Sequence, residues 1–172
     1  MKPSVVFFAL FFVAAGSYAQ VDYDKKLKEL KIELFKPSAP VANYVKAVRV
    51  GNLIFLAGHG PTKADGTNIT GKVGKDLSLE QAYMAANQTA VSILSTLKAE
   101  VGDFNKVKRV VKVLGMVNCT PDFTDHPKVI NGFSDVIVSV FGEKGLHARS
   151  AVGMGSLPMN IAVEVEMIVE VE

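Results

Sequence analysis

The chain has few of the residues that build disulfide-bonded or metal-binding proteins. Its 172 residues include one cysteine, Cys119, three histidines and no tryptophan. A single cysteine excludes an internal disulfide and any cysteine-based zinc site. The histidines, His59, His126 and His147, lack the spacing of metal ligands. We therefore predict no metal, and we expect Cys119 to be a buried, unreactive thiol.

A strong net charge of either sign is also missing. The formal charge is +2 at pH 7, which provides no strong field for a nucleic-acid backbone or an anionic membrane. Basic residues cluster in KVKRVVK (106–112), but their alternation indicates the solvated face of a strand. We therefore expect no nucleic-acid partner.

Long apolar runs are absent except at the N-terminus. Residues 1–19 combine Lys2, an apolar core over 5–15 and a small residue, Ala19, which is typical of a secretory signal peptide. The core is shorter than the roughly 20 residues that span a bilayer. We predict cleavage near Ala19, a secreted or periplasmic location, and no membrane association afterwards. Residues 20–172 would then form one domain, with a formal charge of +1 because Lys2 is the only charge removed.

Hydrophobic periodicity predicts the order helix, strand, strand, helix, strand, helix, strand, strand. Gly51-Asn52 is typical of a hairpin turn, and Ser78 with Gln81 has the spacing of a capping box. The fold class is therefore α/β, more strictly α+β, with two main helices on one face of a single mixed sheet. The expected elements are helices over 23–35, 78–102 and 126–141, and strands over 45–50, 52–58, 107–119, 147–154 and 161–172.

The first helix is expected to be short and amphipathic. Leu27, Leu30 and Leu34 recur at helical spacing among lysines and glutamates. The segment 36–44 contains two prolines, and proline cannot continue helical pairing. We therefore expect the helix to end before this segment.

The last two predicted strands place an arginine among small and apolar residues. If residues 155–160 form a turn, antiparallel pairing sets Arg149 opposite Glu166 and diagonal to Glu164, on the sheet face away from the helices. One interpretation is a solvated cross-strand ion pair, worth about 0–1 kcal/mol.

A second interpretation gives Arg149 a ligand. Ala151 and Gly153 share its face of the strand and are too small to cover a guanidinium. The resulting hollow suits a small molecule or a neighbouring chain. A planar guanidinium can bind a carboxylate through two parallel hydrogen bonds, which fix orientation as well as charge.

Three segments carry a family resemblance: HARSAVGMGSLPMNIAVEVEMIVEV, NYVKAVRVGNLIFLAGHGP and PKVINGFSDVIVSVFG. Together they resemble the reactive-intermediate deaminase family (RidA, also called YjgF or L-PSP endoribonuclease), in its longer-chain branch, over residues 36–172. The most specific elements are A-R-S with L-P eight residues past the arginine, and the terminal V-E-V-E strand. The resemblance implies a chorismate-mutase-like fold, a homotrimer with pockets between subunits, and no cofactor. It also implies hydrolysis of small imine or enamine carboxylates to a 2-keto acid and ammonia.

The resemblance assigns expected roles to particular residues. Arg149 would anchor the substrate carboxylate, and Glu164 would stand beside the attacking water. Tyr44 would line the pocket, Asn131 would support it from the second main helix, and the Gly58 backbone would contact the ligand. Tyr44 and Asn131 also have simpler readings, as a core residue and a solvated residue.

Two departures from the family pattern leave an alternative open. Ala57 and Ala151 stand where many members have polar or thiol side chains, and His59 stands where glutamine is common. His59 could transfer protons near pH 7 or be structural.

The alternative to an imine deaminase is a non-catalytic trimer that binds a small carboxylate or a protein partner. A ribonuclease is disfavoured, because one pocket histidine and a charge near +1 provide neither a paired acid and base nor a basic groove.

Overall fold

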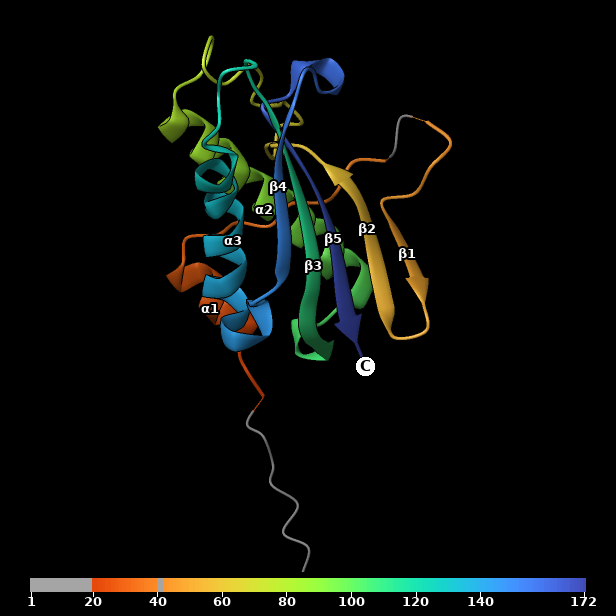
Figure 1. Ribbon diagram of the computed structural model, residues 1–172. Coiled ribbons are helices and arrows are strands. Elements are labelled where there is room, and N and C mark those ends of the chain that lie inside the picture. Colours follow the sequence, from red (N-terminus) through yellow and green to blue (C-terminus); the bar gives the residue numbers. More distant parts are fainter. Residues whose placement is uncertain (1–19, 40–41) are drawn as a thin grey trace, which may run out of the picture.

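The computed structural model describes residues 20–39 and 42–172, so the predicted signal peptide lies outside the described residues. The predicted order of helices and strands is confirmed (Figure 1). Within the described part of the chain, no helix is long and apolar enough to cross a bilayer. The elements are α1 (Tyr23–Glu29), β1 (Ala47–Val50), β2 (Leu53–His59), α2 (Leu79–Val101), β3 (Val107–Asn118), α3 (His126–Phe141), β4 (Ala148–Met154) and β5 (Val163–Val171), with 3-10 turns at Phe104–Lys106, Gly142–Gly145 and Pro158–Asn160.

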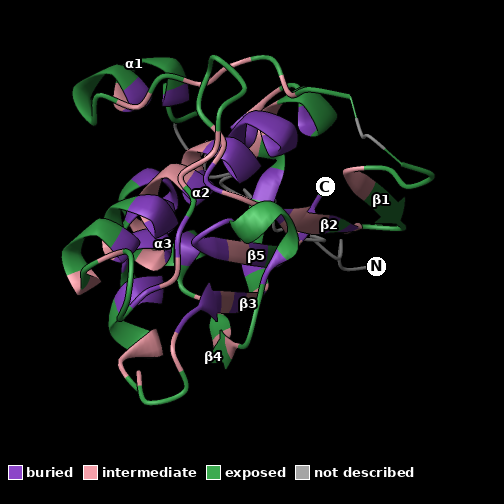
Figure 2. Ribbon diagram, turned by 90° about the horizontal axis from the view of Figure 1, so that it is seen from above, coloured by how far each residue is buried: buried purple, intermediate pink, exposed green. Residues whose placement is uncertain are grey.

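The strands form one five-stranded sheet in the order β1-β2-β5-β3-β4. Neighbouring strands are antiparallel except β3 and β4, which run parallel. Seen from above, α2 and α3 lie on the same side of this sheet (Figure 2). The predicted mixed sheet with both main helices on one face is therefore confirmed.

The core forms where β5 faces the two helices. Alternate residues of β5 from Val163 to Val171 are at most 1% exposed, and the residues between them are not buried. On α2, Ala82, Ala86 and Ala90 are fully buried. Because alanine adds little bulk, the helix axis can lie close to the sheet, and the apolar face of β5 is covered without a gap.

Local signals fix how α2 begins and how closely it meets α3. The Ser78 hydroxyl accepts a hydrogen bond from the Gln81 backbone, and the Gln81 side chain accepts one from the Ser78 backbone, so the predicted capping box is confirmed. On α3, Gly132 packs directly against the Tyr83 carbonyl of α2. Any larger residue at position 132 would separate the two helices.

The first helix is shorter than predicted. It ends at Glu29, and Lys31 takes a left-handed backbone conformation with φ +56°. Of the three leucines only Leu27 lies in the helix, because Leu30 is the C-cap, 37% exposed, and Leu34 follows it. Tyr23 attaches α1 to the domain by packing against two aromatic rings, Phe104 and Phe141, with ring centroids 5.8 and 5.7 Å away.

The predicted closing hairpin is wrong. β4 does not pair with β5, because β3 lies between them. The chain runs from β3 through α3 into β4, and a strand that follows a crossover helix in the same sheet lies parallel to the strand before it. Residues 155–162 then carry the chain past β3 to begin β5. Arg149 shares a face of β4 with Ala151 and Gly153, as predicted, but the predicted pairing of the two strands is wrong.

The sheet face opposite the helices keeps apolar side chains in solvent. Val48, Val50 and Phe55 are 49%, 61% and 41% exposed. A hollow of about 320 Å³ lies on this face, and its lining includes Phe55, Leu114 and Ile168. Such a contiguous apolar area is typical of a surface that a partner covers.

Candidate functional site

Most of the residues predicted for the pocket gather around one cavity. Its volume is about 590 Å³, and it lies at the end of β2, beside the start of β5. Tyr44, Gly58, His59 and Glu164 all contribute to it. The full lining is Ser38, Ala39, Tyr44, Lys46, Ala57, Gly58, His59, Gly60, Thr62, Gly66, Asn68, Ser92, Pro158, Met159, Ile161 and Glu164.

The carboxyl group of Glu164 lies directly over the backbone of Gly58. A β-carbon at position 58 would overlap the Glu164 carboxyl atoms, so only glycine leaves this space free. Burial raises the pKa of the Glu164 carboxyl, and the neighbouring charge of Glu166 raises it further. The cavity therefore holds a carboxyl group that takes up a proton more readily than a solvated glutamate.

Tyr44 and Lys46 stand at the entry to β1 and also line the cavity. Tyr44 is 48% exposed, so it is not a core residue. The Lys46 ammonium donates a hydrogen bond to the Ser38 hydroxyl at 3.3 Å. Burial lowers the pKa of Lys46, because the charged amine loses water. Lys46 is not among the residues predicted for the pocket, although its position two residues after Tyr44 indicates a shared face of the strand.

His59 is held by bonds on both ring nitrogens and is 4% exposed. Its Nδ1 donates to the Ala57 carbonyl at 2.6 Å, and its Nε2 therefore accepts from the Thr96 hydroxyl at 2.8 Å. Burial is the largest cause that lowers the pKa of His59, to about 4. The ring is neutral near pH 7, which favours the structural reading over the proton-transfer reading.

Arg149 lies elsewhere, on the edge strand β4. It pairs with Val113, which is fully buried under the helices, so the arginine is on the helix side of the sheet. Its Nη1 donates to the Asn131 side-chain oxygen at 3.0 Å and to the Ser134 hydroxyl at 2.9 Å. Its Nη2 reaches the Pro127 carbonyl at 3.5 Å.

The predicted neighbours of Arg149 are therefore wrong. Glu164 and Glu166 lie on β5, two strands away, and on the opposite face of the sheet. None of the ion pairs among the described residues includes Arg149. The cross-strand ion pair is excluded, and the guanidinium is positioned by neutral groups that leave its charge uncompensated.

The small residues on the arginine's face have different surroundings. Ala151 is half-buried and packs against the core. At Gly153, the side chains of Cys119 and His126 fill the space next to the α-carbon, and a cavity of about 340 Å³ opens beside them. The Cys119 sulfur lies 3.4 Å from His126 Nε2, and burial raises the pKa of the thiol. The predicted burial of Cys119 is confirmed.

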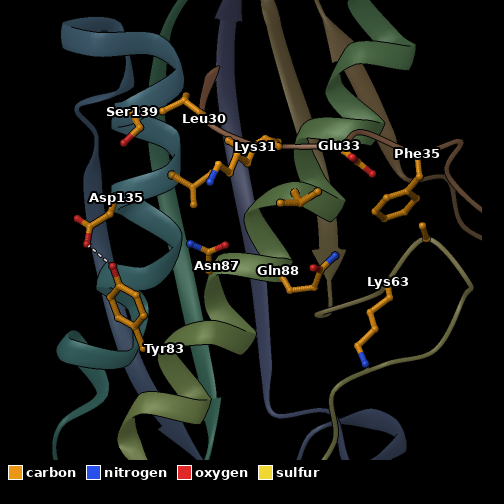
Figure 3. A pocket seen from close by; sticks show the side chains of 14 residues that line it. Leu30, Lys31, Glu33, Phe35, Lys63, Tyr83, Asn87, Gln88, Asp135 and Ser139 are labelled. Carbon is orange, nitrogen blue, oxygen red and sulfur yellow. Dashed lines mark hydrogen bonds between the residues drawn. The ribbon is translucent and has the colours of Figure 1, made fainter. Parts of the chain in front are cut away.

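A further cavity, of about 560 Å³, lies on the helix side between α2, α3 and the segment after α1 (Figure 3). None of the predicted site residues lines it. Its charged residues include Lys31, Lys63, Glu33 and Asp135, so positive and negative charges balance. Asp135 accepts a hydrogen bond from the Tyr83 hydroxyl at 2.8 Å.

One mixed sheet with two helices on a single face, and a cavity at its β2 and β5 end, defines a protein with the chorismate-mutase-like fold. The family model described as "YjgF/chorismate mutase-like, putative endoribonuclease" matches residues 24–171. The chain belongs to this family.

Individual relatives agree with this assignment. The chain is 42% identical to Protein TCP17 of Trypanosoma cruzi, over 92% of this chain and 96% of the relative. It is 31% identical to a 2-iminobutanoate/2-iminopropanoate deaminase of Dermatophagoides farinae, over 77% and 89% of the two chains. The crystal structure of Atu1372 from Agrobacterium tumefaciens, a protein of unknown function, matches with a TM-score of 0.79 at 42% identity, over 87% and 91%. The family thus includes imine deaminases as well as proteins without a defined reaction.

Proposed function

We propose that this protein hydrolyses small imine or enamine carboxylates, of the 2-aminoacrylate type, to a 2-keto acid and ammonia. The observation that carries the proposal is that the chain presents two groups of opposite charge, neither of which has an ion-pair partner among the described residues. Glu164 is a carboxyl with a raised pKa inside a ligand-sized cavity, and Arg149 is a positioned guanidinium without an acidic partner. The 31% identity to an imine deaminase supports the same reaction.

The chemistry needs little from the protein beyond orientation and one proton transfer. An iminium carbon is already electrophilic, so water adds to it directly and forms a carbon–oxygen bond. One water proton passes to the Glu164 carboxylate, and the same carboxyl returns it to the nitrogen, which makes ammonia the leaving group. As the carbon–nitrogen bond breaks and the carbonyl forms, the remaining hydroxyl proton passes to the Glu164 carboxylate and from there to the departing ammonia, which leaves as ammonium. A raised pKa brings the carboxyl closer to the operating pH and improves both transfers.

Arg149 would fix the substrate carboxylate by two parallel hydrogen bonds and so aim the imine carbon at the water. Within one chain it cannot do this, because it lies across the sheet from the Glu164 cavity. We therefore place the complete site between subunits, with Arg149 of one chain facing Tyr44, Gly58 and Glu164 of the next. A homotrimer would supply this contact and would also cover the exposed apolar sheet face.

Replacement of the anchor tests the proposal. Imines generated in place by an amino-acid oxidase would be followed by ammonia release, with Arg149→Ala compared with Arg109→Ala. Arg109 is a solvated arginine on β3 that pairs with Glu170 at 3.5 Å. We expect Arg149→Ala to lose at least about a hundredfold in kcat/KM, because truncation removes a charge-assisted contact, and Arg109→Ala to keep full activity. Normal turnover in the Arg149 variant would refute the proposed role.

A non-catalytic binding protein is the second candidate. Ala57 lines the cavity where many relatives have a polar side chain, and Ala151 packs beside Arg149 without a polar group. Calorimetry with 2-keto acids separates the two candidates. Tight binding without turnover across a broad imine panel would favour the binder, and an absence of binding would exclude both.

A further inference from the structure

The Glu164 cavity contains a cation of its own. Lys46 lines it together with Tyr44, Gly58 and Glu164, and its side chain is half-buried. The backbone at Lys46 is held beside β2, because the Lys46 carbonyl accepts a hydrogen bond from the Ala57 backbone N–H at 3.0 Å. Among the described residues no carboxylate lies within 4.0 Å of its ammonium, which bonds only the neutral Ser38 hydroxyl.

The charge of Lys46 is not cancelled by the acid in the same cavity. Its positive charge acts on His59, where it adds to the burial that lowers the pKa of the imidazole. The pKa of Glu164 is raised by burial and by Glu166. Among the described residues, no salt bridge joins the Lys46 ammonium to the Glu164 carboxyl. A partly desolvated cation without an acidic partner is unfavourable, and an anionic ligand would relieve this.

The size of the cavity allows a ligand longer than a three-carbon acid. Its volume of about 590 Å³ lies within the range of small-molecule sites, roughly 300–1,000 Å³. With Arg149 of a neighbouring chain at its mouth, the site would present two cations together with the Glu164 carboxyl. A ligand that satisfies both needs two anionic groups separated by the reacting carbon.

We propose that Lys46 binds a second carboxylate and thereby selects imines of acidic amino acids, the four- and five-carbon dicarboxylates. This inference rests on the proposed function, because Arg149 must hold the carboxylate next to the imine carbon. Glu164 then stands beside the imine nitrogen and the water, and Lys46 receives the carboxylate at the far end of the chain. Lys46 is a specificity-determining residue in this arrangement, since it contacts no reacting atom.

The test compares substrates rather than total activity. Imines formed in place from aspartate or glutamate would be compared with imines formed from alanine or 2-aminobutyrate. We expect the wild-type protein to prefer the dicarboxylates, and Lys46→Met to reduce that preference by about tenfold to a hundredfold, as the loss of one charge-assisted hydrogen bond implies. Lys46→Met keeps the length and the apolar stem of lysine, and Lys46→Arg, which keeps the charge, should restore most of the preference.

Lys63→Met is the matched control, because Lys63 lines the helix-side cavity of Figure 3 and not this one. It should leave the preference unchanged. An equal loss for both substrate classes in Lys46→Met, or no preference in the wild-type protein, would overturn the assignment of Lys46. Circular dichroism melting of each variant shows whether the fold is retained.

Binding measurements separate a failure of this inference from a failure of the proposed function. If the wild-type protein hydrolyses no imine, calorimetry with oxaloacetate and with pyruvate still tests Lys46. Tighter binding of oxaloacetate that is lost in Lys46→Met supports the inference without catalysis. Equal affinities, or no binding of either acid, would refute it.

Discussion

The Glu164 cavity and the Arg149 edge hold their charged groups in opposite ways. In the cavity, burial shifts the pKa of Glu164 upward and that of His59 down to about 4. At the β4 edge, Arg149 is held by two neutral side chains, Asn131 and Ser134, and stays partly in solvent. The cavity therefore shifts the pKa of the groups that it buries, whereas the β4 edge presents the permanent positive charge of Arg149.

The difference agrees with the separate roles that we propose for Glu164 and Arg149. Groups that exchange protons benefit from a low-dielectric setting, where small changes in surroundings alter their pKa. A carboxylate anchor benefits instead from a guanidinium whose charge is uncompensated and whose direction is fixed. Within one chain, the order β1-β2-β5-β3-β4 puts the two settings on different parts of the sheet, so the guanidinium does not neutralise the Glu164 carboxyl of its own chain.

Acid should act on the cavity through His59. Because its folded-state pKa of about 4 lies below the unfolded value of about 6.5, the unfolded chain binds the extra proton first as the pH falls. Stability that is present above pH 6.5 is therefore lost between pH 6.5 and 4, by up to about 3 kcal/mol. Urea unfolding of the wild type and of His59→Gln across this window measures the difference. The same pH dependence in both proteins would show that the cavity is not the acid-sensitive region.

Mixing two inactive variants should show whether the two regions form one site across subunits. Arg149→Ala and Glu164→Gln are each expected to be nearly inactive. In mixed trimers, about a quarter of the interfaces would combine an intact arginine from one chain with an intact glutamate from the next. Co-refolding and an ammonia assay should then recover about a quarter of wild-type activity. An unchanged background after mixing would mean that no site is shared between chains.

The smallest effect is expected from the glycine beneath Glu164. Gly58→Ala would place a methyl group where the Glu164 carboxyl lies, and the flexible end of the glutamate would rotate away. We expect kcat to fall by about tenfold through misplacement of the carboxyl, with little change in melting temperature. Gly155→Ala is the control, because no atom lies within 4 Å of a β-carbon there. Equal activity in the two variants would argue against a defined position for Glu164.

Local sequence signals determined most of the fold. The capping box at Ser78, the bounds of α3 and the alternation of β5 depend on neighbouring residues, so they could be predicted. The partner of β4 could not be deduced from its own residues, since an alternating strand fits beside several others. The signal that was available lay in the chain order: a helix between two strands favours parallel pairing and would have placed β4 beside β3.

The candidate site shows the same limit. Tyr44, Gly58 and Glu164 line one cavity, and the family resemblance could group them because it spans all three segments. The predicted neighbours of Arg149 are wrong for the same reason as the predicted hairpin, because a wrong strand pairing changes every cross-strand contact of that strand. Lys46 could not be predicted in this way, because the resemblance gives no role to its position and only the cavity shows that it and Glu164 line the same space.

The contact between Gly132 of α3 and the Tyr83 carbonyl of α2 links the packing of the two helices to the position of Arg149 on β4. Gly132 immediately follows Asn131, whose side-chain oxygen accepts a hydrogen bond from the Arg149 guanidinium. The distance between α2 and α3 therefore helps to set the direction of the Arg149 side chain, although Arg149 itself lies on β4. To redesign the β4 edge for another anion, the distance between α2 and α3 would have to be changed first, before any solvent-exposed residue is replaced.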